Sequence, residues 1–183
     1  MAVESIAELK TAVSKLIQII TGVNAVIEAN QDQAPPPGLY GTYNITPMRA
    51  YGHPRKVRVD TPAEEPGPEP DWTDYSESTI SQILINVSIN FFEPGSLEAI
   101  TKLHNANFRQ PVREHLYQND MAWRNAGDIR ELSDKYNGQI QQRFQADVQL
   151  VVETSITDTV LKAAGFSIEV IDENGNIISS GGV

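Results

Sequence analysis

Residues 80–92 read ISQILINVSINFF, and this stretch decides the fold. Isoleucine, valine or phenylalanine occupies every second position from Ile83 to Phe91, and asparagine or serine stands at most of the positions between them. This period of two is typical of a strand with one face buried and the other in water. At ~3.3 Å per residue the stretch would extend about 43 Å, well beyond a usual strand of ~5 to 6 residues. We therefore predict a long strand that bends or extends past its own core.

A second long strand is predicted over residues 139–153. Its apolar face starts at Ile140 and continues through Phe144 to Val152, while glutamines, Arg143 and Asp147 form the other face. One buried and one wet face fits an antiparallel sheet that helices cover on one side. Residues 166–170 alternate again, and Asn174-Gly175 is a type I′ turn signal, so a hairpin is expected there.

Two segments have the three-and-four spacing of an amphipathic helix. The first covers about residues 4–29, with Ser5 and Glu8 as a capping box at its start. The second covers residues 97–116 and follows a Pro-Gly stop, and Pro111 should kink or split it. Both helices present one apolar side, which fits packing on one face of the predicted sheet.

Residues 39–78 lack a sustained period, and only residues 40–45 and 56–59 resemble short strands. The segment is basic first and acidic afterwards. It is interpreted either as a mobile solvated loop or as an arm that a neighbouring subunit orders. The whole pattern predicts a single α+β domain over residues 1–183, with a mainly antiparallel sheet, helices packed on one face, and a long Pro-rich arm or loop over residues 39–78.

Composition narrows the function further. The 183-residue chain has a formal net charge of -10, which argues against a protein that mainly grips phosphates. It has no cysteine, so disulfides, thiolate nucleophiles and cysteine-based zinc sites are excluded, consistent with assembly in a reducing cytoplasm. No secretory signal or ~20-residue apolar span is evident, and we expect no membrane contact.

The search for chemistry yields few candidates. His53, His104 and His115 are the only histidines, and none lies in a metalloprotease motif. No phosphate-binding loop, dinucleotide fingerprint or nucleophile elbow is present. The oxygen-rich residues 172–176 lack the ligand spacing of an EF-hand, so a plain hairpin turn is favoured. We expect no catalytic residues, no cofactor and no metal, and therefore no enzyme.

Three stretches carry a resemblance to a known family. Residues 125–133 read NAGDIRELS, residues 142–148 read QRFQADV, and residues 156–160 read ITDTV. In this order they resemble the neck and tail-terminator family of tailed bacteriophages, and the layout of helices and strands agrees over nearly the whole chain. The family's aromatic-glycine pair is replaced here by Phe91-Phe92-Glu93-Pro94-Gly95, and the acidic insert over residues 60–77 is longer than typical.

The resemblance implies a structural virion protein of the tail or neck, assembled in the host cytoplasm. It implies a homohexameric ring that stacks on the tail tube protein, ends tube growth and docks the neck connector or stopper. The tail sheath is a further candidate partner, and DNA would pass through the lumen without specific binding. The alternatives are another head-tail adaptor, a tail-completion protein or a small ligand-binding module.

The expected subunit or partner contacts lie on the arm and on the two long strands, because a long strand can reach a neighbour's sheet edge and an arm without a core can be ordered by adjacent subunits. The residues expected there are Arg49, Arg55, Lys56, Arg58, Glu64, Glu65, Glu69, Asp71, Trp72, Ile85, Val87, Arg143 and Gln145.

Overall fold

A computed structural model describes residues 5–32, 34–62, 73–136, 138–160, 167–171 and 177–182. The chain divides into two compact units, which are treated separately below. The first comprises Met1–Arg55 and Ile80–Ser155, and the second comprises Lys56–Thr79 and Ile156–Val183. The single domain predicted over residues 1–183 stays a prediction.

The first unit is built on a sheet with strand order β1-β2-β4-β9-β5, and β6 also pairs with β9. Strands β1 and β2 pair in parallel, while β2 with β4, β5 with β9, and β6 with β9 are antiparallel. The sheet strands are β1 (Val26–Glu28), β2 (Tyr40–Ala50), β4 (Thr73–Phe92), β5 (Met121–Ala126), β6 (Arg130–Glu131) and β9 (Arg143–Val160). A separate hairpin joins β7 (Asp134–Tyr136) to β8 (Gln139–Gln141). The predicted α+β class with a mainly antiparallel sheet is confirmed.

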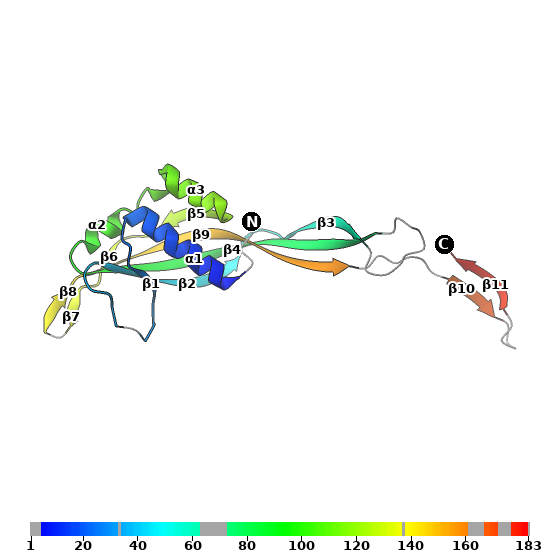
Figure 1. Cartoon of the computed structure of the whole chain (residues 1–183), viewed down its shortest axis with the longest axis horizontal. Helices are drawn as coiled ribbons and strands as arrows, with labels where there is room; N and C mark the ends of the chain where they lie inside the picture. The colour runs from blue at the N-terminus through cyan, green and yellow to red at the C-terminus, as the bar shows by residue number, and fades with distance from the viewer. Residues whose placement is uncertain are drawn as a thin grey trace. The chain divides into compact units, whose positions relative to one another are not determined.

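Three α-helices lie on one side of this sheet (Figure 1). They are α1 (Ile6–Thr21), α2 (Ser96–Thr101) and α3 (Gln110–Gln118). Val13 and Ile17 of α1, together with Val112 of α3, are at most 1% exposed and belong to one apolar cluster with the sheet. Burying such side chains is the main source of stability of a domain, so the core of this unit lies between its helices and its sheet.

The alternating face of β4 is confirmed, since its residues from Ile85 to Phe91 at every second position are at most 2% exposed. The strand begins at Thr73, well before the predicted start at Ile80. On β9, the alternating residues from Ala146 to Val152 are also buried. The prediction fails at Ile140, which belongs to β8 and is 72% exposed.

Helix α1 ends at Thr21 and not near residue 29 as predicted. Gly22 takes a left-handed conformation with φ +79°, and its N–H donates to the Gln18 carbonyl oxygen at 2.8 Å. A glycine in this conformation is a common helix stop because it has no Cβ to clash. The predicted start is supported, since the Glu8 N–H donates to Ser5 Oγ at 3.2 Å.

The second predicted helix is split, as expected, but Pro111 is not where it breaks. The chain leaves α2 after Thr101, forms one 3₁₀ turn over Ala106–Phe108, and enters α3 at Gln110. Pro111 therefore lies in the first turn of α3, where the missing N–H would have had no helical partner.

The second unit contains most of β3 (Arg55–Pro62), the first residues of β4 and the last residues of β9. It also contains the antiparallel pair β10 (Ser167–Ile171) and β11 (Ile177–Gly182), which agrees with the expected C-terminal hairpin. The turn signal at 174–175 lies outside the described residues. Among the described residues, no helix is long and apolar enough to span a bilayer.

The predicted loop over residues 39–78 needs correction where the structure describes it. Residues 40–50 and 55–62 are strands longer than the predicted short ones, and residues 73–78 already belong to β4. The parts of these strands that the sequence does not reveal, residues 46–50 and 60–62, are mostly exposed, so no core selects an apolar face there. Whether this segment acts as an arm toward a neighbouring subunit stays a prediction.

Candidate interaction surfaces

The sheet face of the first unit that carries no helix is polar. Asn90 of β4 is only 8% exposed, and its Oδ1 accepts hydrogen bonds from Arg143 Nε at 3.1 Å and Nη2 at 3.0 Å. The Arg143 guanidinium also lies over the Phe92 ring, 5.4 Å from its centroid, and Phe92 stacks on Tyr40 with ring centroids 4.8 Å apart. The guanidinium is thus fixed by an amide and a ring, which suits a preformed contact surface.

Further side-chain bonds cross the same face. Gln145 Nε2 donates to Ser88 Oγ at 2.7 Å, and Arg130 forms an ion pair with Asp147. These bonds join β4, β6 and β9, so the polar side chains satisfy one another across the strands. The resulting surface can bind a partner through hydrogen bonds, and it brings together no nucleophile with a base.

A charged cluster lies within the second unit. Two cations of β3 bond the carboxylate of Glu77 on β4. Lys56 Nζ lies 2.5 Å from Glu77 Oε1, and Arg58 Nε lies 2.7 Å from Glu77 Oε2. The hydrogen bonds from Lys56 and Arg58 lower the pKa of Glu77, and the bond to Glu77 raises the pKa of Arg58. Arg58 also lies over the Tyr75 ring, 5.0 Å from its centroid. Two cations on one carboxylate leave the cluster with a positive charge.

The strands of the second unit have no apolar core among the residues whose burial is described. Across residues 56–62, 73–79 and 156–160, no apolar side chain is buried. Val59 is 58% exposed and Ile156 is 68% exposed. A sheet normally needs a second layer or further strands to be stable in water, so these strands present surfaces suited to covering by another molecule.

The structure separates the residues that the sequence predicts as contacts. Arg49 and Arg55 are exposed, and Arg55 Nη2 lies 3.6 Å from Glu153 Oε1. Ile85 and Val87 are buried in the core at 2% and 1% exposure, so their side chains are not on a surface that a partner could touch. Lys56 and Arg58 share the Glu77 cluster, and Arg143 and Gln145 share the polar face. Outside the described residues lie Glu64, Glu65, Glu69, Asp71 and Trp72.

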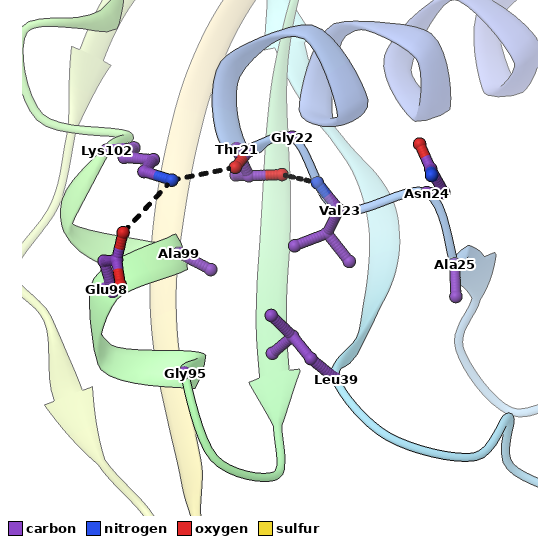
Figure 2. Close-up of a pocket in the computed structure, with 10 residues that line it drawn as sticks. All are labelled: Thr21, Gly22, Val23, Asn24, Ala25, Leu39, Gly95, Glu98, Ala99 and Lys102. Carbon is purple, nitrogen blue, oxygen red and sulfur yellow. Dashed lines mark hydrogen bonds and ion pairs between the residues drawn. The ribbon is translucent and has the colours of Figure 1, made fainter.

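A hollow of about 450 Å³ lies beside the C-terminal end of α1 (Figure 2). Lys102 Nζ donates to the Thr21 carbonyl oxygen at 3.2 Å there and lies 3.5 Å from Glu98 Oε1. Arg109 Nη1 donates to the Ile20 carbonyl oxygen at 2.7 Å. These two cations stabilise the last carbonyl groups of a helix whose own last turn has no basic residue. The side chains around the hollow therefore have a structural role.

The histidines do not form a reaction centre. His115 Nε2 is hydrogen-bonded to the Ala12 carbonyl oxygen at 2.9 Å, which joins α3 to α1. His53 and His104 are exposed on different parts of the chain. Within the described part of the chain, no group of three or more histidine, aspartate or glutamate residues is placed to hold a metal ion.

Sequence reasoning missed two pairings that shape these surfaces. The sequence places Glu77 at the end of an acidic run, although the structure pairs it with the basic strand β3. Asn90 was assigned only to a wet face, although it receives Arg143 and is nearly buried. The alternation of β4 and β9 places Asn90 and Arg143 on polar faces. The two residues are 53 positions apart in the sequence, and only the register of the two strands brings them together.

A comparison with protein families identifies the chain. A family model described as "Phage neck terminator protein" matches residues 7–180. No curated protein matches the chain. The matched segment covers all but the first six and the last three residues, so it includes most of both units and the surfaces described above. The chain therefore belongs to the phage neck terminator protein family, whose members have a structural role in the neck and tail of the virion.

Proposed function

We propose that this protein forms a homohexameric ring at the head-proximal end of the tail, ends growth of the tail tube and joins the tail to the neck connector. Its partners would be further copies of itself, the tail tube protein and the connector or stopper, with the sheath as a further candidate. Assembly would take place in the host cytoplasm. The family membership supports the location in the neck, and the finer steps are our proposal.

One observation carries the proposal, namely the coreless strands of the second unit. An isolated chain would leave Val57, Val59 and Ile156 in water, and their exposure gives the strands little stability of their own. A ring supplies the missing contacts, because each subunit can cover its neighbour. A fold that enclosed a reaction centre would instead direct such strands around a pocket. In the hollow beside α1, the Lys102 side chain already bonds the Thr21 carbonyl oxygen and pairs with Glu98.

Charge supports the passage of DNA without binding. The chain carries a formal net charge of -10, so a lumen lined by it would repel phosphates on average. We propose that the ring acts as a conduit and not as an enzyme. The dispersed histidines and the interlocked polar face support this view, because general acid–base catalysis needs positioned groups within reach of one substrate.

Deleting the gene from the phage tests the proposal. Electron microscopy should then show tails of irregular length that are not joined to filled heads, and a plasmid copy should restore normal particles. A tagged copy should be located as one ring between tube and connector. Normal joined particles without the protein would overturn the proposal, and a tag at another axial position would identify a different adaptor.

A further inference from the structure

The outer edge of strand β9 beyond Glu153 is open among the described strands, and from Ile156 on this edge belongs to the second unit. The neighbours of β9 are β4, β5 and β6, with β5 paired to residues 148–152 and β6 paired to residues 144–145. Residues 154–160 thus have only β4 beside them among the described strands. They read TSITDTV, in which five of seven residues are β-branched. Such residues favour extended backbone, so this edge is a ready template for another strand.

Apart from the single charge of Asp158, this edge lacks the devices that normally prevent pairing. Natural edges are blunted by lysine, proline or a bulge. Strand β2, whose outer side β1 covers only at residues 41–43, has Pro47 in its uncovered part, and its register shifts between Pro47 and Arg49. Residues 154–160 contain no lysine, arginine, proline or glycine. The difference indicates that the β9 edge is kept free for a partner strand.

A strand of suitable length lies on the other side of β4. Strand β3 covers eight residues, and β4 is its neighbour within the described part of the chain. Its Lys56 and Arg58 side chains turn to Glu77 on β4, so they do not block the outer backbone of β3. Among the strands that the structure describes around the start of β4, two edges are therefore open, β3 on one side of β4 and β9 on the other (Figure 1).

Both edge strands run in the same direction. Arg143 of β9 bonds Asn90 of β4, and Thr157 of β9 bonds Ser78 of β4. The residue number therefore rises along β9 as it falls along β4. In the same way Lys56 of β3 bonds Glu77, while Arg58, two residues later, lies over Tyr75. Strands β3 and β9 are thus each antiparallel to β4. Because rotation about a ring axis keeps the direction of every strand along that axis, β9 of one copy would meet β3 of the next copy in parallel.

The chemistry of the two edges matches on both faces of the sheet. Ser78 Oγ lies 2.8 Å from Thr157 Oγ1, so these two side chains share a face, and the adjacent Glu77 and Asp158 share the opposite one. Lys56 and Arg58 lie on the Glu77 face because they bond Glu77. A continued sheet would place Asp158 beside these two cations of the next copy. On the other face it would place Thr157 and Thr159 beside Val57 and Val59.

We propose that residues 154–160 of β9 pair in parallel with β3 of a second copy of this chain, and that this pairing joins neighbouring subunits. The inference deepens the proposed ring and rests on it. Backbone hydrogen bonds would join the copies, Asp158 opposite the Lys56 and Arg58 pair would set the register, and the β-branched ladder would exclude water from one face.

Cysteine cross-linking tests the pairing directly, because the chain has no cysteine of its own. Two single variants, Thr159→Cys and Val59→Cys, would be purified separately, mixed and oxidised, with Val57→Cys as the partner for a register shifted by two residues. A disulfide needs Cα atoms within about 7 Å and side chains on one face. We expect a covalent dimer on a non-reducing gel only from the mixtures that contain Thr159→Cys with one of the valine variants.

The matched control is Asp158→Cys mixed with Val59→Cys, whose side chains lie on opposite faces and should give at least tenfold less dimer. Circular dichroism would establish that every variant keeps the fold. Equal cross-linking in the control mixture, no dimer in the valine mixtures, or dimer from Val59→Cys or Thr159→Cys alone would each overturn the proposal. The last two results would indicate another occupant and a two-fold pairing of like edges, respectively.

A charge variant gives an independent measurement. Asp158→Lys places a third cation beside Lys56 and Arg58 of the next copy, and Asp158→Asn only removes the attraction. We expect the subunit dissociation constant at low salt to rise about fivefold or more for lysine, and less for asparagine, since exposed charge pairs are worth ~0.2–1 kcal/mol. Unchanged dissociation constants for both variants would contradict the proposed register.

The two proposals can fail separately. If particles form normal rings in the neck while the cysteine mixtures stay monomeric on the gel, the terminator function stands and the β3–β9 pairing is wrong. If the mixtures cross-link while deletion of the gene leaves joined, normal particles, the pairing stands and the proposed function is wrong.

Discussion

The two units of this protein use the same strands in opposite ways. In the first unit, β4 and β9 bury Val87 and Val148 at 1% exposure beneath three helices. In the second unit, the other ends of these strands leave Ile156 at 68% exposure, with no helix among the described residues. The comparison shows that strand formation and core formation are separate properties, because the same backbone pairing continues where burial stops.

The difference also separates stability from function. The first unit has the buried area that a stable domain needs, and its side chains are fixed against one another. The second unit has charges and open edges, which contribute little to the stability of one chain but much to contact with another. Substitutions in the first unit should therefore change folding, and those in the second unit should change assembly.

The sharpest test replaces one isoleucine in each unit. Ile17→Ala removes a side chain that is 1% exposed, and we expect it to lower the free energy of unfolding by about 2–5 kcal/mol. Ile156→Ala makes the same chemical change at a 68% exposed site and should cost within about 0.5 kcal/mol. Urea unfolding followed by circular dichroism would measure both. Equal losses would break the contrast between the units.

The packing of the first unit can be probed by adding one methyl group. A Cβ at Gly41 would lie 2.7 Å from Phe91 Cε1, and Phe91 is completely buried. Gly41→Ala should therefore cost about 1–3 kcal/mol of unfolding free energy by overpacking. In a Phe91→Leu background, which removes the clashing ring atom, the added cost should be smaller. A double-mutant cycle by urea unfolding would measure this coupling.

A smaller effect is expected at the end of α1. Arg109→Ala removes the guanidinium that bonds the Ile20 carbonyl oxygen, and it should destabilise the first unit by about 0.3–1 kcal/mol through the helix dipole. Arg113→Ala, at an exposed site on α3, is the matched control and should change stability less. Thermal unfolding of both variants would compare them, and an equal shift in Tm would contradict a capping role for Arg109.

The smallest expected effect is a pH dependence within the second unit. Lys56 and Arg58 lower the pKa of Glu77, so the folded state holds its proton less tightly than the unfolded chain. The stabilisation is therefore complete above the ordinary glutamate pKa of ~4.3 and is lost as pH falls through the lower folded value. NMR titration should place Glu77 below that ordinary value.

Two comparisons sharpen this titration. Glu77→Gln should remove the stability change between neutral and acidic pH that belongs to this cluster. High salt should weaken the effect, because Lys56 and Arg58 are 62% and 61% exposed. An ordinary or raised pKa for Glu77 would argue against the cluster in solution.

The sequence predicts the first unit far better than the second, and the reason is burial. Alternation identified β4 from Ile83 to Phe91 because a core selects apolar residues on one face. From Tyr75 to Ser78 no core makes such a selection, so the start of β4 left no pattern to detect. An apolar residue can also be buried outside a helix. Val23 is buried although it follows the end of α1, and its place in the apolar spacing made the predicted helix too long.

For the candidate surfaces, the sequence predicts on which face of a strand a side chain lies, but not which side chains it contacts. The polar positions of β9 correctly placed Arg143 and Gln145 on the side away from the core. Their partners Asn90 and Ser88 depend on strand register, which a single sequence does not specify. The open edge of β9 could not be predicted for a different reason. It exists because β5 begins at Met121, which pairs with Val152, so β5 does not cover the later residues of β9.

Helix α1 is the first part of the described chain to be synthesised, yet the groups that hold it come much later. The carbonyl groups of Thr21 and Ile20 are bonded by Lys102 and Arg109, which follow them in the sequence by 81 and 89 residues. At ~5–20 residues per second, these separations correspond to roughly 4 to 18 seconds on the ribosome. A 16-residue helix is marginal alone in water, so its apolar side is a target for holding chaperones until α2, α3 and the sheet have been made.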